Sequence, residues 1–270
     1  LPHANAPGRK EEIPSGLALS PDGKRLYVVL NLSNRLAELD AATGRVLRLW
    51  DVGFAPYDVV LVGSKAYVSN WGGRRPDATS VTGPGVRGTR VRVDPVRHIA
   101  SEGSVTVIDL AENRVKKEML TGLHASALAV APGHRHLVVA NSASDNLSVI
   151  DTKTDEIVET VWVKSSPAEL FGASPTALAF DRRGRRLFVC NGGMNAVAVI
   201  GFKPGRSRLL GHIPVGWFPG AVVHDAGRQA LYVANIKGIS PGRVNAKTGR
   251  LEYNSHQYHG SLSLFPVPDQ

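Results

Sequence analysis

The chain has 270 residues, of which 43% are hydrophobic and 20% charged, and its formal net charge is +9 at pH 7. This length and composition are those of a globular protein, and they exclude a disordered or low-complexity chain. No stretch reaches the roughly eighteen apolar residues of a membrane span, and the N-terminal stretch LPHANAPGRKEE contains no signal-peptide apolar segment.

The positive charge makes nucleic acid or another polyanion a candidate partner. However, the Lys and Arg residues are distributed along the chain, mostly in expected turns such as SPDGKR and DRRGRR. This distribution favours a solvated basic surface over a dedicated binding groove. The single cysteine, Cys190, lies in the apolar run RLFVCN, which predicts a buried thiol.

The first predicted unit, residues 13–50, contains the apolar runs GLALS, RLYVVLN and RLAELD. The turn SPDG between the first two runs is typical of a tight hairpin, because Pro and Gly occupy the positions that such turns favour. Runs of this length and composition predict β-strands. Stretches such as LYVV are apolar on both faces of a strand and therefore need cover on both sides.

The same order of runs recurs along the chain. The second unit, residues 51–118, contains YDVVLV, KAYVSN and SVTVID. The third, 119–166, contains SALAVA, HLVVAN and NLSVID. The fourth, 167–214, contains TALAFD, RLFVCN and AVAVIG, and the fifth, 215–266, contains GAVVHD, ALYVAN and SLSLFP.

The second run of every unit ends at an asparagine: Asn31, Asn70, Asn141, Asn191 and Asn235. Asn tolerates left-handed turns and bonds its own backbone, so we predict a structural role for these residues. One unit cannot bury both of its faces alone, whereas units stacked around an axis can. The sequence therefore predicts an all-β fold: a β-propeller with four-stranded antiparallel blades, of which five repeats are visible.

Two units are longer than the others. The excess residues, 72–103 and 236–260, both fall between the second and third predicted strands of a unit. Alternate connections in an up-and-down blade emerge at opposite ends, so both insertions, together with the links between blades, are expected at one mouth of the propeller. Loops on a rigid scaffold commonly carry function, so we predict that this mouth is the binding face.

Candidate binding residues follow from this placement. Aromatic and acidic residues at the starts of inner strands could contact a small ligand or could simply pack between sheets. The arginines of the first insertion could bind phosphate or an acidic partner, although the insertion has few aromatic residues for base stacking. The candidates are Tyr57, Asp58, Trp71, Arg74, Arg75, His124, Trp217, Phe218, Lys237, His256 and His259.

Motifs of known chemistry are missing from the sequence. It has no GxSxG, no HExxH, no catalytic-cysteine context and no glycine-rich phosphate loop that opens a helix. We therefore predict no catalytic residues, no metal and no cofactor. A metal site that includes His124, His256 and His259 is the weaker alternative, because zinc sites need three or four ligands with short-spaced pairs.

The runs LYVAN, NLSVID and SPDGKRLYV resemble the YVTN-type β-propeller repeats of bacterial surface-layer and periplasmic proteins. More narrowly, PYDVV, AYVSNWGG, GWFPGAVV, LYVANIKG and HGSLSLFPVP resemble the propeller region that precedes a phosphoesterase domain of the alkaline phosphatase superfamily in some bacterial proteins. The resemblance covers nearly the whole chain. It implies a seven-bladed ring, a periplasmic or extracellular location and an adjacent phosphoesterase domain. The metal-binding phosphatase part is absent from this sequence, so no phosphatase activity is transferred.

The sequence begins on a first strand and ends after a third strand, which suggests a fragment whose missing blades come from the rest of a longer polypeptide. The expected function is that of a non-catalytic scaffold that binds a protein partner or a small ligand at its loop-decorated face. Two alternatives remain open at this point. One is a hydrolase of the propeller lactonase kind, with acids and histidines at the channel mouth, and the other is a binder of nucleic acid or another polyanion.

Overall fold

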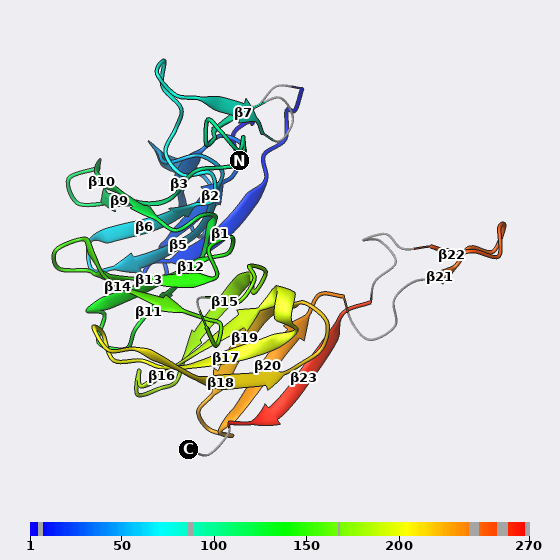
Figure 1. Ribbon diagram of the computed structural model, residues 1–270. Coiled ribbons are helices and arrows are strands. Elements are labelled where there is room, and N and C mark those ends of the chain that lie inside the picture. The colour runs from blue at the N-terminus through cyan, green and yellow to red at the C-terminus, as the bar shows by residue number, and fades with distance from the viewer. Residues whose placement is uncertain (5–7, 86–88, 167, 238–242, 253–258, 268–270) are drawn as a thin grey trace. The chain divides into compact units, whose positions relative to one another are not determined.

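The computed structural model describes residues 1–270 except 5–7, 86–88, 167, 238–242, 253–258 and 268–270 (Figure 1). All of its sheets are antiparallel, and the described residues contain no α-helix, only one 3-10 turn at Gly192–Met194. The prediction of an all-β fold built from four-stranded antiparallel sheets is confirmed. No helix that could cross a membrane occurs in the described part of the chain.

The chain divides into two compact units, Leu1–Thr160 and Val161–Gln270. The first unit contains three four-stranded sheets and a small hairpin, and the last strand of its third sheet runs into the second unit. The first sheet has the order β1 (Pro14–Leu19), β2 (Arg25–Leu30), β3 (Arg35–Asp40), β4 (Val46–Asp51). The second has the order β10 (Arg114–Thr121), β9 (Gly103–Asp109), β6 (Lys65–Asn70), β5 (Pro56–Val62). The third has the order β11 (Ala125–Val130), β12 (His136–Asn141), β13 (Asn146–Asp151), β14 (Glu156–Trp162). The hairpin pairs β7 (Thr82–Pro84) with β8 (Arg90–Arg92).

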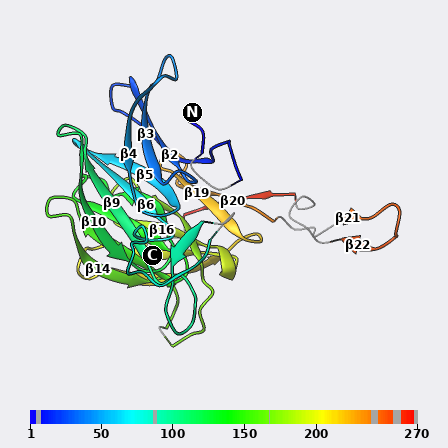
Figure 2. The same ribbon diagram turned by 90° about the horizontal axis from the view of Figure 1, so that it is seen from above.

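The second unit contains a fourth sheet of four strands and a fifth sheet of three described strands. The fourth has the order β15 (Pro175–Phe180), β16 (Arg186–Asn191), β17 (Ala196–Gly201), β18 (Arg208–Pro214). The fifth has the order β19 (Pro219–Asp225), β20 (Ala230–Asn235), β23 (Ser261–Pro266). A further hairpin pairs β21 (Arg243–Val244) with β22 (Leu251–Glu252). Figures 1 and 2 both show the neighbouring strands β19 and β20 of the fifth sheet.

Two details of the strands differ from the sequence-based expectation. Strand β10, which closes the second sheet, runs to Thr121 and so passes the predicted boundary at residue 118. Both insertions, expected as plain loops, contain short hairpins of their own, because β7 pairs with β8 and β21 pairs with β22.

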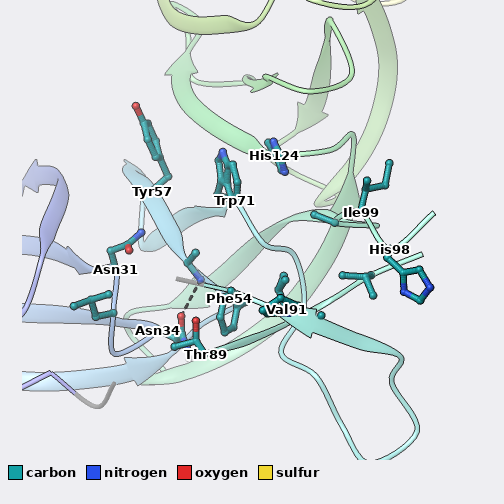
Figure 3. Close-up of a pocket in the computed structure, with 17 residues that line it drawn as sticks. Asn31, Asn34, Phe54, Tyr57, Trp71, Thr89, Val91, His98, Ile99 and His124 are labelled. Carbon is teal, nitrogen blue, oxygen red and sulfur yellow. Dashed lines mark hydrogen bonds between the residues drawn. The ribbon is translucent and has the colours of Figure 1, made fainter. Parts of the chain in front are cut away.

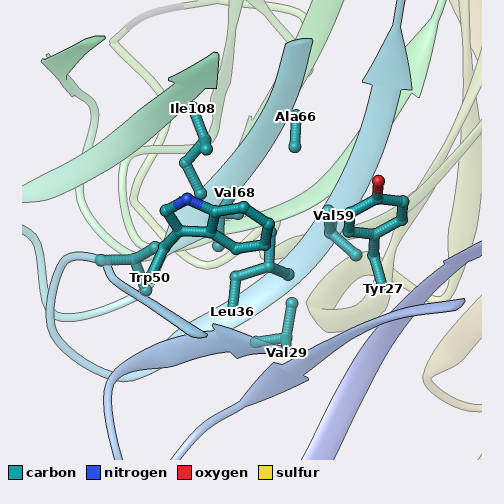
Figure 4. Close-up of a cluster of buried hydrophobic side chains, with 9 residues drawn as sticks. Tyr27, Val29, Leu36, Trp50, Val59, Ala66, Val68 and Ile108 are labelled. Carbon is teal, nitrogen blue, oxygen red and sulfur yellow. The ribbon is translucent and has the colours of Figure 1, made fainter. Parts of the chain in front are cut away.

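Apolar side chains on both faces of the second sheet explain the sequence pattern. On one face, Val68 and Ile108 pack against Trp50 of the first sheet (Figure 4). On the other face, Tyr67 and Val105 belong to a cluster that includes residues of the third sheet. The second sheet is therefore covered on both sides, as strands with apolar side chains on both faces require.

The asparagines at the ends of the second strands have a structural role, but not through the left-handed turns and own-backbone bonds that the sequence predicts. The Asn70 amide donates to the hydroxyls of Ser104 and Thr106, and Asn235 donates in the same way to Ser261 and Ser263. In these two sheets the bonds tie the end of the second strand to the neighbouring third strand, whereas Asn31 donates to the Pro56 carbonyl and Asn191 to the Val163 carbonyl. The predicted burial of Cys190 is also confirmed, and burial raises the pKa of its thiol to about 12.

One backbone feature recurs at the start of four inner strands. The residue just before the strand adopts a left-handed conformation, which is strained by about 1–2 kcal/mol for residues other than Gly. Its carbonyl accepts the N–H of the residue that follows the asparagine of the same sheet, at 2.9 to 3.0 Å. The left-handed residues are Ala55 (φ 49°), His124 (φ 57°), Ser174 (φ 52°) and Phe218 (φ 57°).

Candidate functional site

A pocket of about 770 Å³ lies in the first unit, between the links that precede inner strands and the β7–β8 hairpin of the first insertion (Figure 3). Phe54 and Ala55 of the link before β5 form one side, together with Tyr57 at the start of β5. The hairpin contributes Thr89 and Val91 to the lining. The first insertion therefore creates the pocket by folding back over a link.

The Trp71 and His124 side chains stack at one wall of this pocket. Their ring centroids are 3.6 Å apart and their planes differ by 14°. Trp71 follows β6, and its backbone N–H donates to the Ala55 carbonyl at 3.0 Å. His124 is the left-handed residue before β11, and burial holds the pKa of its imidazole below the ordinary value of 6.5. The ring is therefore uncharged at pH 7.

Two asparagines of the first sheet also line the pocket, and hydrogen bonds fix both. Asn31 donates through Nδ2 to the Pro56 carbonyl at 2.8 Å, and Asn34 accepts the Ala55 N–H through Oδ1 at 2.8 Å. Each bond uses one polar atom of the amide. Within the part of the chain that the structure describes, Asn31 Oδ1 and Asn34 Nδ2 thus remain for a ligand on side chains whose positions are already set.

Charged side chains are missing from the described lining of the pocket: none of these residues is Asp, Glu, Lys or Arg. The lining combines aromatic rings and aliphatic groups with neutral amides, a hydroxyl and two imidazoles. Ligand pockets generally have this character, an apolar wall with a few placed polar groups, in a volume of about 300–1,000 Å³.

Arg74 and Arg75 of the first insertion, which the sequence predicts as candidate phosphate ligands, bond other parts of the protein. Arg74 bonds Glu102 at the far end of the insertion, through Nε at 2.9 Å and Nη2 at 2.5 Å. Arg75 donates through Nε to the Val52 carbonyl at 2.7 Å, and through Nη2 to the Asn34 carbonyl. Their guanidinium groups are thus occupied by protein acceptors.

The glycine beside these arginines is required for the insertion to close. Gly73 has a left-handed φ of 74°, and a Cβ there would lie 2.4 Å from the Glu102 Cβ. The two ends of the insertion can approach this closely only at a residue without a side chain.

Asp58, the acidic candidate at the start of an inner strand, connects two sheets. Its Oδ2 accepts the N–H of Leu128 on β11 at 2.9 Å, and its Oδ1 accepts the N–H of Val59 at 2.8 Å. Burial raises the pKa of this carboxyl group, and the two backbone N–H groups oppose that shift. Oδ2 therefore joins β5 to β11, whereas Oδ1 bonds the next residue of its own strand, and Asp58 is not among the described lining residues of the pocket.

The second unit brings three further candidates together. The Lys237 ammonium lies 5.1 Å from the Trp217 ring centroid and 5.2 Å from that of Phe218. The Phe218 N–H donates to Asn195 Oδ1 at 3.0 Å. His259 is described and exposed, whereas His256 lies outside the described residues.

No three His, Cys, Asp or Glu side chains come together as a possible metal site among the residues that the structure describes. The pocket itself holds two histidines, His98 and His124, without an acidic lining residue in the described part.

Several pocket residues are missing from the sequence-based candidates, among them Phe54, Asn34 and Thr89. A repeat alignment contains a signal for Asn34, because Asn34 and Asn195 occupy equivalent turns. Both have left-handed backbones and accept the N–H of a link residue. Thr89 and Val91 reach the pocket only because the insertion folds back, which no local pattern indicates.

Comparison with known proteins gives the fold alone. No family model matches the chain, and no curated protein matches it either. The crystal structure of a functionally unknown protein from Desulfotomaculum acetoxidans DSM 771 is similar, with a TM-score of 0.61 and 13% identity over 89% of this chain and 68% of that chain. Kuenenia stuttgartiensis hydrazine synthase is similar with a TM-score of 0.47 and 17% identity, over 96% of this chain and 85% of that chain. The four-stranded antiparallel sheets make this an all-β, propeller-like protein.

Proposed function

We propose that this chain is a non-catalytic β-propeller scaffold that binds a ligand at the pocket between its links and its first insertion. The observation that carries the proposal is an aromatic pocket of about 770 Å³ with fixed amide groups and no Asp, Glu, Lys or Arg among its described lining residues. Trp71 and Tyr57 are 40% and 43% exposed, although aromatic side chains of this size usually bury more of their surface. A ligand or a side chain of a partner protein would cover them.

The lining favours binding over the alternative functions. A lactonase-like hydrolase needs acidic groups near the histidines, and a polyanion site needs free cationic groups. The described lining residues include neither, and the nearby Arg74 and Arg75 bond protein acceptors. We therefore propose only binding for this site.

We further propose that additional blades, supplied by the rest of a longer polypeptide, extend this propeller toward the seven blades that the sequence resemblance implies. Val197 and Val199 of the fourth sheet belong to the apolar cluster that it shares with the fifth sheet. Their equivalents in the fifth sheet, Leu262 and Leu264, are 65% and 58% exposed. An apolar sheet face of this kind needs a covering layer.

The same resemblance supports a periplasmic or extracellular location and an adjacent phosphoesterase domain as the protein partner. Both belong to the proposal and rest on the sequence motifs LYVAN, NLSVID and AYVSNWGG.

Saturation-transfer NMR with a mixture of uncharged aromatic and hydroxylated fragments tests the proposed site. We expect fragments to receive saturation from the wild-type chain and to lose it in Trp71→Ala. Phe171→Ala is the matched control, because Phe171 is an exposed aromatic residue (69%) outside the pocket, and it should bind like the wild type. Equal saturation in wild type and Trp71→Ala, with both folded by circular dichroism, would contradict the proposal.

A further inference from the structure

The chemistry of the pocket lining narrows the class of ligand, and this step rests on the proposed function. A charged ligand would lose its hydration on entry and would find no counter-charge among the described lining residues. The imidazole of His124 is kept neutral by burial and supplies no charge at pH 7. The described lining residues therefore favour an uncharged ligand.

The aromatic wall requires a ligand with a flat apolar face. The Trp71 ring is held from one side by the His124 ring at 3.6 Å, so the indole is a rigid surface that a ligand can meet without ordering it first. The face of an aromatic ring carries negative charge density and attracts weakly positive C–H groups. A ring that presents C–H groups along one face matches such a wall.

The side-chain amides of Asn31 and Asn34 call for a ligand with hydrogen-bonding groups around its flat face. The bonds to Pro56 and Ala55 leave an acceptor on Asn31 and a donor on Asn34. A hydroxyl group both donates and accepts, so it can satisfy either atom. A purely apolar ligand would leave both amide atoms without partners. The carbonyls of a proline-rich peptide accept but do not donate, so they would satisfy Asn34 and leave Asn31 unpaired.

We infer that the pocket binds an uncharged carbohydrate of more than one sugar ring. A pyranose has C–H groups on its faces and neutral hydroxyls around its edge, which is the combination that Trp71 and the two asparagines present. The volume of about 770 Å³ lies in the upper part of the range for small-ligand sites, which gives room beyond a single ring.

Isothermal titration calorimetry on the full chain tests this inference with maltotriose, cellotriose and chitotriose. Trigalacturonate is a charged trisaccharide of the same size, and a ten-residue polyproline peptide represents the peptide class. We expect saturable binding of at least one uncharged trisaccharide, with trigalacturonate weaker by about tenfold or more because its carboxylates lose hydration without compensation.

Two variants connect binding to the pocket. Trp71→Ala should weaken the trisaccharide by about tenfold or more, because it removes the aromatic wall. Asn34→Asp keeps the Oδ1 acceptor for the Ala55 N–H and replaces the Nδ2 donor with an oxygen. It should weaken binding several-fold while the melting temperature stays close to that of the wild type. Phe171→Ala should leave the affinity unchanged.

Absence of binding by all three uncharged trisaccharides would overturn the carbohydrate assignment, and so would equal binding of trigalacturonate. Binding of the polyproline peptide that depends on Trp71, without any trisaccharide binding, would also overturn it but would leave the proposed function intact. The proposed function fails separately, when the uncharged fragments bind wild type and Trp71→Ala equally.

Discussion

Two junctions between neighbouring sheets share a left-handed residue before an inner strand, but their side chains differ. A junction here is the contact between the residue after the asparagine of one sheet and the left-handed residue that begins the next sheet. In the first unit these residues are Trp71 and His124, whose rings stack. In the second unit they are Gly192 and Phe218, and a Cβ on Gly192 would lie 2.9 Å from the Phe218 ring.

The difference shows that the side chains at a junction decide how its aromatic residue packs. Phe218 lies over Gly192 and has the Lys237 ammonium 5.2 Å from its ring centroid. Trp71, by contrast, stays 40% exposed and forms a wall, and the β7–β8 hairpin supplies the opposite wall. In both units the residue after the asparagine donates its backbone N–H to the carbonyl of the left-handed residue of its own sheet, Trp71 to Ala55 and Gly192 to Ser174.

The largest expected effect is a difference in stability between alanine variants of the two glycines that follow the junction residues Trp71 and Gly192. A Cβ on Gly193 would lie 1.8 Å from the Gly172 carbonyl oxygen, whereas a Cβ on Gly72 would meet the movable Phe54 ring at 2.6 Å. We expect Gly193→Ala to lower the free energy of unfolding by about 3 kcal/mol and Gly72→Ala by about 1 kcal/mol, as overpacking does. Urea unfolding monitored by circular dichroism measures both.

Gly211→Ala is the control for this pair, because a Cβ there meets nothing within 4 Å. It should unfold at the wild-type urea concentration. Equal destabilisation by Gly193→Ala and Gly72→Ala would show that the two junctions are equally rigid, contrary to the comparison.

A smaller effect is expected when the left-handed residues are replaced by glycine. In His124→Gly, relief of about 1 kcal/mol of backbone strain offsets the loss of a ring stack worth about 0.5–1.5 kcal/mol, so stability should stay nearly unchanged. In Phe218→Gly the strain is relieved as well, but the apolar contact with Gly192 is also lost. We expect that variant to be less stable by about 1 kcal/mol in urea unfolding. The comparison would be wrong if His124→Gly were the more destabilised of the two.

The smallest expected effect is a pH dependence found only at the first-unit junction. Burial disfavours the charged imidazole, so the pKa of His124 is lower in the folded than in the unfolded state. Its contribution to stability is therefore fully present above pH 6.5 and is lost as the pH falls through the folded-state pKa. An NMR titration of the His124 ring protons should give a pKa below 6.5.

His124→Phe makes the first-unit junction resemble the second, since Phe218 has no titrating group. The variant should lose this part of the change in stability between pH 7 and pH 5. A His124 pKa at or above 6.5 would contradict the burial argument.

The sequence predicts the strands well because their pattern reports local structure. Runs such as LYVV are apolar at both parities, and Tyr27 and Val28 indeed belong to buried clusters on opposite faces of β2. The position of the first insertion, between β6 and β9, also follows from the spacing of Asn70 and Asn141. Local composition and repeat length were sufficient for both.

The site is less predictable because distant contacts determine it. Trp71 and His124 can be chosen from sequence as residues near a mouth, but their stacking joins two sheets. The sequence predicts Arg75 as a candidate phosphate ligand, yet it donates to the backbone carbonyls of Val52 and Asn34, which carry no sequence signal. Asp58 likewise bonds the N–H of Leu128, so its role depends on how the sheets are stacked.

The most direct measurement is a two-dimensional NMR titration of the tryptophan indole N–H signals of the full chain with the trisaccharide that binds in calorimetry. If the first-unit pocket is the binding site, the Trp71 signal moves in a saturable way, and the signals of Trp162 and Trp217 stay in place. A Trp71 signal that does not move while Trp217 responds would assign binding to the second-unit junction and would contradict the account.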